Sequence, residues 1–573
     1  MKIDCVTKQQ PLFSSFECHA LCFLGVSPAV REFLNFSQRT DVFSTSVFTL
    51  ENTMKLLRTL LLLLHLLPTY SLYDYRYRDI LNTKEKNKDN FQSHNYTDAT
   101  DDVEELFLEQ RLDHFDANNV ATFQQRYFVT KRYLVPDSNF EVTFLCVGGE
   151  GPGFTKSVLI DSDHCTGDLL LSAERLAKAY GISVNVYALE HRYYGSSYPD
   201  FSEGESPVSN KNLKYLSSRQ ALEDLAHFVD KINEKHGKVT KWVTFGGSYP
   251  GIMAANARLK YPHMIYAAVA NSAPIRFEVD YPEYNQVVAS DLAYSKIGGS
   301  QVCLDIVKQG HNQAVALLEK NHSALGEMFN VCEPDRLKHR RNQELLLGDG
   351  LIGIPAQSND PSCKGDLCNI QNLCHFMTTT SSNSSALEIL ANVAKMQQRS
   401  SECMQVDWNA TLIELSSPIV TNGGWRSWLW QTCTEFGFYQ TCDDSCPYAS
   451  AFHSVDMDLE ICKVAFNITD VYENVQDSIN YYGGLDVSDA SRILYTNGDV
   501  DPWSALGLQE SPKDSVPAVL VKGASHHAWT HRVSAEDWPE IVMVREYIYS
   551  KVKNWLDVDQ TKSLRGERTT STF

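Results

Sequence analysis

The sequence lacks features that two broad classes of protein require. No apolar run approaches the eighteen or so residues of a membrane-spanning helix. No dense basic patch occurs either, since residues 338–341 form the richest basic run and it is short. The 573 residues carry 51 Lys and Arg against 71 Asp and Glu, a formal net charge of −20. Because so acidic a surface repels phosphate backbones, we expect no membrane span and no nucleic-acid partner.

Motifs for metals and nucleotides are also missing. The sequence has no H-E-x-x-H motif and no Walker-type glycine loop. Cys363, Cys368 and Cys374, or Cys442 and Cys446, could be imagined as zinc ligands, but paired C-x-x-C spacing is absent. Disulfide bonds explain these cysteines better, so we expect no metal and no cofactor.

The amino-terminal part contains a pattern typical of a secretory signal peptide. A charged start at Met54 precedes an apolar stretch over 60–67, and small polar residues follow as far as Ser71. We therefore predict a signal peptide at 54–71 and interpret residues 1–53 as a gene-model extension. A weak signal anchor or a buried helix remains the alternative.

Cysteine parity and glycosylation sequons favour the secretory pathway. Of fifteen cysteines, Cys5, Cys18 and Cys22 precede Met54, which leaves twelve for up to six disulfides. Because no KDEL-type ending is present, we expect a secreted or lysosomal protein. Five N-x-[ST] sequons predict glycosylation, at Asn95, Asn321, Asn383, Asn409 and Asn467.

Strand-like and helix-like segments alternate in the rest of the chain. Helical periodicity over 217–236 starts at a capping box formed by Ser217 and Gln220, and Gly237 ends it. This alternation predicts an α/β fold with a mainly parallel sheet. Short apolar strands are predicted at 142–147, 182–189, 242–245, 267–270, 492–495 and 518–521. Residues 276–470 are rich in cysteine and helix patterns, which indicates a large insertion.

A glycine-rich turn between a predicted strand and helix has the pattern of a nucleophile elbow. Residues 246–251 read Gly-Gly-Ser-Tyr-Pro-Gly, which places Ser248 where the sharp turn exposes a hydroxyl. Pro250 stands where the usual G-x-S-x-G motif has glycine, but the amide of Tyr249 remains free to stabilise an oxyanion. A packing turn without catalysis is the alternative interpretation.

Two later loops supply the acid and base that such a serine needs. Asp499 and Asp501 follow one late strand, and His526 and His527 follow the next. This order, serine then acid then histidine, is that of α/β-hydrolases. Either aspartate could orient either histidine. The aspartates could instead serve only as turn formers, and one of the two histidines could be a packing residue.

Four motifs together resemble a known family of serine exopeptidases. They are residues 246–249 (GGSY), 190–195 (EHRYYG), 497–503 (NGDVDPW) and 523–526 (GASH). The chain is similar over 106–557 to the Pro-X carboxypeptidase and dipeptidyl-peptidase II family. Residues 283–288, 297–300 and 428–439 look most like its thymus-specific serine protease branch.

The resemblance implies both a fold and a site. The fold implied is an α/β-hydrolase with a large, mainly helical, disulfide-containing cap insertion. The nucleophile implied is Ser248, the acid is Asp501 and the base is His526. The implied activity is peptide cleavage, with proline commonly at the cleavage point.

The domain division follows from the resemblance and from composition. We expect a flexible leader or propeptide at 72–105 and the first part of the hydrolase domain at 106–275. The cap insertion is expected at 276–470, the second hydrolase part at 471–557 and a polar tail at 558–573.

The insertion also suggests how substrate binds. A cap of that size should roof the triad and leave a closed-ended cleft, so short peptides would enter by one terminus. We predict an oxyanion hole from the amides of Tyr249 and of Gly149 or Glu150. A homodimer is left open, and an esterase or lipase and an inert binding protein are the alternative functions. The aromatic-rich segment 425–439 is the candidate pocket wall, with Trp425, Trp428 and Trp430, and its alternative role is the core of the cap. Glu435 within it could bind a substrate amine or pair with a nearby arginine.

Overall fold

The computed structural model describes residues 102–202, 204–380, 384–398 and 403–558. The predicted extension, the signal peptide and most of the leader lie outside this range, as does the tail from 559 onward. Among the described residues, no helix combines the length and apolar character that crossing a membrane requires.

An eight-stranded sheet forms the centre of the fold. Its strand order is β1-β2-β4-β3-β5-β6-β9-β10. β1 and β2 are antiparallel to each other, β2 is antiparallel to β4, and the remaining neighbours are parallel. The strands are β1 (Val103–Arg111), β2 (Thr122–Thr130), β3 (Glu141–Val147), β4 (Ser183–Leu189), β5 (Lys241–Gly247), β6 (Ile265–Asn271), β9 (Ile493–Gly498) and β10 (Ala518–Val521).

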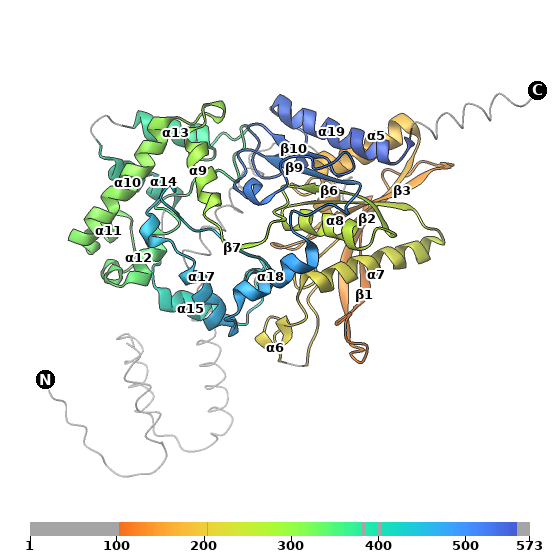
Figure 1. Ribbon diagram of the computed structural model, residues 1–573, viewed down its shortest axis with the longest axis horizontal. Helices are drawn as coiled ribbons and strands as arrows, with labels where there is room; N and C mark the ends of the chain where they lie inside the picture. Colours follow the sequence, from red (N-terminus) through yellow and green to blue (C-terminus); the bar gives the residue numbers. More distant parts are fainter. Residues whose placement is uncertain (1–101, 203, 381–383, 399–402, 559–573) are drawn as a thin grey trace, which may run out of the picture. The chain divides into compact units, whose positions relative to one another are not determined.

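Helices cover both faces of this sheet, as Figure 1 shows. α7 (Ser218–His236) and α8 (Tyr249–Lys260) pack on one face, and α5 (Leu171–Tyr180) and α19 (Pro539–Trp555) pack on the other. Alternation along β4 explains the two layers, since Tyr187 belongs to the first apolar cluster and Val186 to the second. Strands buried on both faces read as continuous apolar runs, and this is why the sequence pattern revealed them.

The start and end of α7 follow the sequence signals. The Ser217 side chain accepts a 3.2 Å hydrogen bond from the Gln220 amide, and Gly237 ends the helix at φ 63°. The Gln220 side chain donates to Asp113 instead of reaching back to Ser217, so only half of the predicted capping box forms. β1 starts at Val103, three residues before the predicted start of the hydrolase domain at 106.

A large, mainly helical cap lies between β6 and β9 in the chain. It has its own apolar cluster, which includes Val307, Phe329 and Leu390 and also Val500 from the loop after β9. A two-stranded parallel ladder, β7 (Glu278–Asp280) with β8 (Gly437–Tyr439), lies within it and was not predicted. The helices of this segment are α9 (Glu283–Ala293), α10 (Gln301–Lys320), α11 (His322–Met328), α12 (Arg340–Leu347), α13 (Ile370–Thr379), α14 (Ala386–Gln397), α15 (Trp408–Ser416), α16 (Trp425–Gln431) and α17 (Asp456–Ile461).

All twelve cysteines that follow Met54 are paired. Five of the pairs lie in the cap, and the sixth joins Cys146 of β3 to Cys165. The cap pairs are Cys303–Cys374, Cys332–Cys403, Cys363–Cys368, Cys433–Cys462 and Cys442–Cys446. The chain is therefore an α/β-hydrolase with a large, mainly helical, disulfide-containing cap, as predicted.

Candidate active site

Ser248 occupies a sharp turn between β5 and α8. Its backbone has φ 64° and ψ −133°, a region that costs a non-glycine residue about 1–3 kcal/mol. The Ser248 amide donates to the Asn271 carbonyl at 2.9 Å, which fixes the turn against β6. A Cβ on Gly246 would lie 2.2 Å from the Pro250 carbonyl oxygen, so glycine is required there. The predicted nucleophile therefore has the geometry of an elbow.

Pro250 fits the elbow because of the glycine opposite it. A Cβ on Gly149 would lie 2.5 Å from Cγ of the Pro250 ring, so the ring packs directly on the bare backbone. Proline is tolerated in a first helical turn, where its missing N–H has no intrahelical partner. The departure from the usual motif is thus accommodated within the turn.

The aspartate and histidine that were predicted to form a pair do meet. Nδ1 of His526 lies 2.8 Å from Oδ2 of Asp501, and both side chains are buried. Oδ1 of Asp501 accepts a 3.0 Å bond from the Trp503 amide, which orients the carboxylate. Nε2 of His526 has no hydrogen-bond partner among the described residues. A base held by a buried acid, with its second nitrogen available, can take a proton from a serine.

Asp499 has a different environment. Its Oδ1 accepts a 2.5 Å bond from the Gly523 amide, and its Oδ2 lies 3.4 Å from Nζ of Lys522. These contacts join the loop after β9 to the loop after β10. Asp499 supports the loops, whereas Asp501 contacts the histidine.

His527 is held by residues beside the elbow. Its amide donates to Oγ of Ser272 at 2.8 Å, and its Nδ1 lies 3.1 Å from Oγ1 of Thr530. Its ring packs over Gly247, where a Cβ would come within 2.9 Å of it. We assign His527 a packing role beside the elbow.

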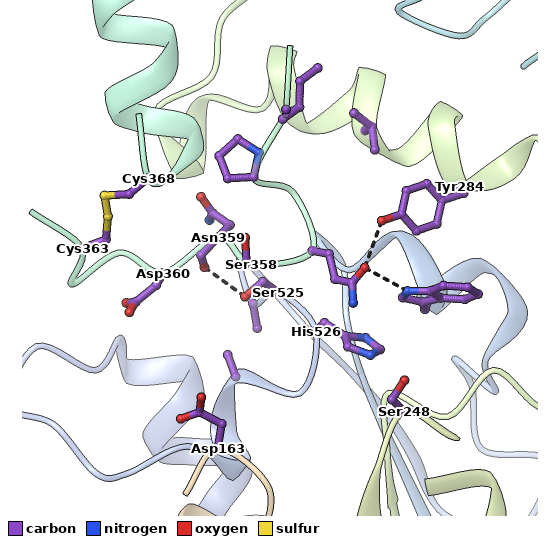
Figure 2. A pocket seen from close by; sticks show the side chains of 18 of the residues that line it. Asp163, Ser248, Tyr284, Ser358, Asn359, Asp360, Cys363, Cys368, Ser525 and His526 are labelled. Carbon is purple, nitrogen blue, oxygen red and sulfur yellow. Dashed lines mark hydrogen bonds between the residues drawn. A yellow bond between two sulfur atoms is a disulfide. The ribbon is translucent and has the colours of Figure 1, made fainter. Parts of the chain in front are cut away.

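Ser248 and His526 line one cavity of about 1720 Å³. Figure 2 shows the Ser248 hydroxyl pointing toward the His526 ring. Both residues follow strands that lie in the β5-β6-β9-β10 half of the sheet, where parallel strands end at a common edge. The cap contributes much of the remaining lining, including 349–368 and 437–440.

The predicted oxyanion residues surround the elbow. Tyr249 begins α8, and its hydroxyl lies 2.9 Å from Nε2 of His191 and 3.0 Å from Nε2 of Gln431. Burial lowers the pKa of His191 to about 4, so this histidine is neutral at pH 7. Glu150 lines the cavity, and Gly149 lies under the Pro250 ring.

The aromatic segment of the cap divides between cavity and core. Trp425 and Trp428 line the cavity as expected. Trp430 does not, because its indole N–H donates to the Leu216 carbonyl at 3.1 Å and its ring packs on Phe466. On a helix, neighbouring positions face different directions, so the cluster of tryptophans could not all point one way.

Glu435 also lies away from the cavity. Its carboxylate accepts 2.9 Å bonds from the amide and the hydroxyl of Ser218, at the start of α7. Burial raises the pKa of Glu435 to about 7. Glu435 is therefore not positioned to meet a substrate amine in the cavity. Its carboxylate instead caps the start of α7, where the positive charge of Arg219 acts on it, in keeping with the alternative of a nearby arginine.

A cap loop missed by the sequence analysis contacts the base directly. The Gln357 carbonyl accepts a 3.2 Å bond from the His526 amide, and the Asn359 carbonyl accepts a 2.9 Å bond from Oγ of Ser525. No local pattern marks residues 349–368, because their partners lie more than 160 positions away. Only the length of the insertion indicated that the cap could reach the site.

Three of the five predicted glycosylation sites lie on the surface of the described structure. Asn321, Asn409 and Asn467 are exposed, whereas Asn95 and Asn383 lie outside the described residues. In the part of the chain that the structure describes, no group of three His, Cys, Asp or Glu side chains could hold a metal ion.

Comparison with known proteins decides the family. The model of the serine carboxypeptidase S28 family matches residues 110–548. The chain belongs to this family. Thymus-specific serine protease of Mus musculus is 33% identical over 475 residues, which cover 80% of this chain and 88% of the relative. The Homo sapiens protein of that name is 32% identical, over 80% and 88% of the two chains.

A second group of S28 relatives is more distant. Lysosomal Pro-X carboxypeptidase of Homo sapiens is 27% identical over 475 residues, covering 79% of this chain and 88% of the relative. Among solved structures, an acetylester hydrolase from Corynebacterium glutamicum aligns with a TM-score of 0.35 at 9% identity, covering 80% and 99% of the two chains. The S28 membership makes this protein a serine-type peptidase.

Proposed function

We propose that the protein is a serine exopeptidase that uses Ser248, Asp501 and His526 as its catalytic triad. The observation that supports this most strongly is the 2.8 Å bond between His526 and buried Asp501, beside a strained Ser248 in the same cavity. Removing the acid from water makes its interaction with the histidine strong and its geometry fixed.

The proposed reaction has two halves. His526 takes the Ser248 proton as the oxygen attacks a peptide carbonyl, and Asp501 stabilises the resulting imidazolium. The Tyr249 amide and that of Gly149 or Glu150 hold the oxyanion. His526 then gives this proton to the leaving amine, the C–N bond breaks, and the acyl group remains bonded to Ser248 as an acyl-enzyme. Water then attacks the acyl-enzyme with His526 as base and restores the Ser248 hydroxyl.

We propose that the substrates are short peptides cleaved near one end. The cap lines the cavity together with Ser248, and this arrangement favours a chain terminus over the middle of a folded protein. Trp425 and Trp428 offer flat rings against which a proline or small residue at the scissile position could pack. The name of one relative, lysosomal Pro-X carboxypeptidase, supports proline at this position.

We also propose a secreted or lysosomal location, with a signal peptide at 54–71. Six disulfides and three exposed sequon asparagines support an oxidising compartment. Cleavage after Ser71 predicts that amino-terminal sequencing of the secreted protein starts at residue 72. Material that starts at Met1 would contradict this part.

Peptide profiling tests the proposed activity. The purified enzyme is incubated with a mixed peptide library, and its products are identified by mass spectrometry. We expect cuts near one terminus, with proline or a small residue at the scissile position. Efficient internal cutting of long, terminally blocked peptides would contradict the proposal, and faster turnover of lipid esters would favour the esterase alternative.

A further inference from the structure

Gln357 is a cap residue that is hydrogen-bonded to the proposed base. It lies in the loop between α12 and α13 and lines the cavity with Ser248 and His526. Its carbonyl accepts the 3.2 Å bond from the His526 amide. This backbone contact fixes the cap loop to the loop of His526. The Cα atom of Gln357 is therefore held in place close to the proposed catalytic residues.

The orientation of the Gln357 amide is determined by its neighbours. Oε1 of Gln357 accepts from Nε1 of Trp503 at 3.2 Å and from the Tyr284 hydroxyl at 3.0 Å (Figure 2). An indole N–H can only donate, so the atom that faces Trp503 must be the oxygen. The two N–H groups of Nε2 therefore point elsewhere, and no described residue accepts a hydrogen bond from them.

The two residues that hold the amide are themselves fixed. The rings of Tyr284 and Trp503 pack edge to face with centroids 5.4 Å apart, and Tyr281 contacts both rings. Trp503 follows directly on the Asp501-Pro502 turn of the proposed triad. A donor locked in this way loses little conformational entropy when it binds a ligand.

The charge of the cavity limits what this donor binds. Carboxylates predominate over cations in the lining, and Arg532 is already paired with Asp161 at 3.2 Å. A free carboxylate would be repelled there, whereas an uncharged carbonyl oxygen would not. The acidic lining residues are Glu150, Asp161, Asp163, Asp349, Asp360, Asp366, Asp458, Glu536 and Asp537, and the lysine and arginine residues are Lys364 and Arg532.

We propose that Gln357 is a substrate-binding residue whose Nε2 donates to a peptide carbonyl oxygen on the leaving-group side of the scissile bond. The inference rests on the proposed function, since the leaving amine must lie beside His526 to receive its proton. Gln357 is bound to the loop of that histidine, whereas the proposed oxyanion donors lie on the elbow and on the loop after β3. On the leaving-group side of the substrate, the first carbonyl after the scissile bond is the acceptor that we assign to Nε2 of Gln357.

Matched substrates test this assignment. Alanyl-prolyl-alanine amide has a carbonyl after the scissile bond, alanyl-proline p-nitroanilide has none, and alanyl-prolyl-alanine adds a carboxylate. Gln357→Glu keeps the acceptor for Trp503 and Tyr284 but removes the donors, and Gln357→Met removes the donors without adding charge. Gln476→Glu, on an exposed face of α18 (Val471–Tyr482), adds the same charge outside the cavity.

We expect both Gln357 variants to lose at least tenfold in kcat/KM on the peptide amide and less than threefold on the anilide. Fluorophosphonate should label Ser248 of both Gln357 variants as fast as it labels the wild type. The Gln476→Glu control should have the wild-type kcat/KM on both substrates. An equal loss on amide and anilide, no loss at all, or a loss confined to the free acid would overturn the inference alone. A wild-type enzyme not labelled at Ser248 would overturn the proposed function and this inference together.

Discussion

The imidazole of His526 and the carboxylate of Asp501 lie 2.8 Å apart in the protein interior, although 25 positions separate them in the chain. The contact joins the loops after β9 and β10. Both loops carry a second candidate, Asp499 and His527, and the structure gives each of these a different partner. This difference makes the proposed triad open to direct test.

Asp501→Asn should lower kcat by about 10⁴ while leaving the fold intact. The amide cannot hold the histidine in the tautomer that accepts a proton from serine. The matched variant Asp499→Asn loosens the contact with the Gly523 amide and should cost far less activity. Steady-state kinetics and thermal unfolding of both variants check this. A larger loss of kcat in Asp499→Asn would reverse the assignment of the acid.

His526→Ala should lower kcat by about 10⁶, and His527→Ala should be milder. Members of a triad act as a unit, so removing the base costs nearly the whole catalytic advantage. The His527 side chain contributes packing over Gly247 and a contact with Oγ1 of Thr530, whereas its backbone bond to Ser272 is retained in the variant. Kinetics measured after correction for the folded fraction separate the two effects. If His527→Ala were the more damaging variant, our choice of base would be wrong.

Glu435 should make the protein less stable as pH rises from about 4.5 to about 7. Its folded pKa, raised by burial to about 7, exceeds the unfolded value of about 4.3, so the folded state binds the extra proton in this window. By pH 7, the free energy of unfolding should have fallen by at most about 3 kcal/mol because of this group.

The Glu435→Gln variant isolates this effect, since other titrating groups are common to both proteins. Relative to Glu435→Gln, the wild type should lose unfolding free energy between pH 4.5 and pH 7. Urea titrations at the two pH values measure the difference. A difference between the two proteins that does not change with pH would show that Glu435 does not titrate in this range.

The Cys433–Cys462 disulfide should contribute about 3–4 kcal/mol, the chain-entropy value for a closed loop of about thirty residues. It connects the helical turn Thr432–Phe436, which follows α16, to the helical turn Cys462–Phe466, which follows α17. The double variant Cys433→Ser/Cys462→Ser should lower the urea midpoint correspondingly. Unchanged stability, or a free thiol at either position in the wild type, would refute the pairing.

Much of the hydrolase core could be predicted because its signals are local. Buried parallel strands appear as apolar runs, and the elbow of Ser248 appears as a run of glycines between a strand and a helix. The same logic places Asp501 and His526 on loops that follow late strands.

The cap side of the site could not be predicted, because its contacts are non-local. Gln357 acquires its orientation from Tyr284 and Trp503, which lie 73 and 146 positions away. Trp430 and Glu435 were placed in the pocket on composition, whereas helix geometry turns them toward Leu216 and Ser218. Composition cannot distinguish the cavity face of a helix from its core face.

The most direct test of the account is to identify the residue that a fluorophosphonate modifies. The wild-type protein is labelled, digested and mapped by tandem mass spectrometry beside the His526→Ala variant. We expect a single adduct on Ser248, formed much more slowly when His526 is absent, because the hydroxyl is then a weak nucleophile. A wild-type protein with no adduct on Ser248, or with equal labelling in the His526→Ala variant, would contradict the proposed triad.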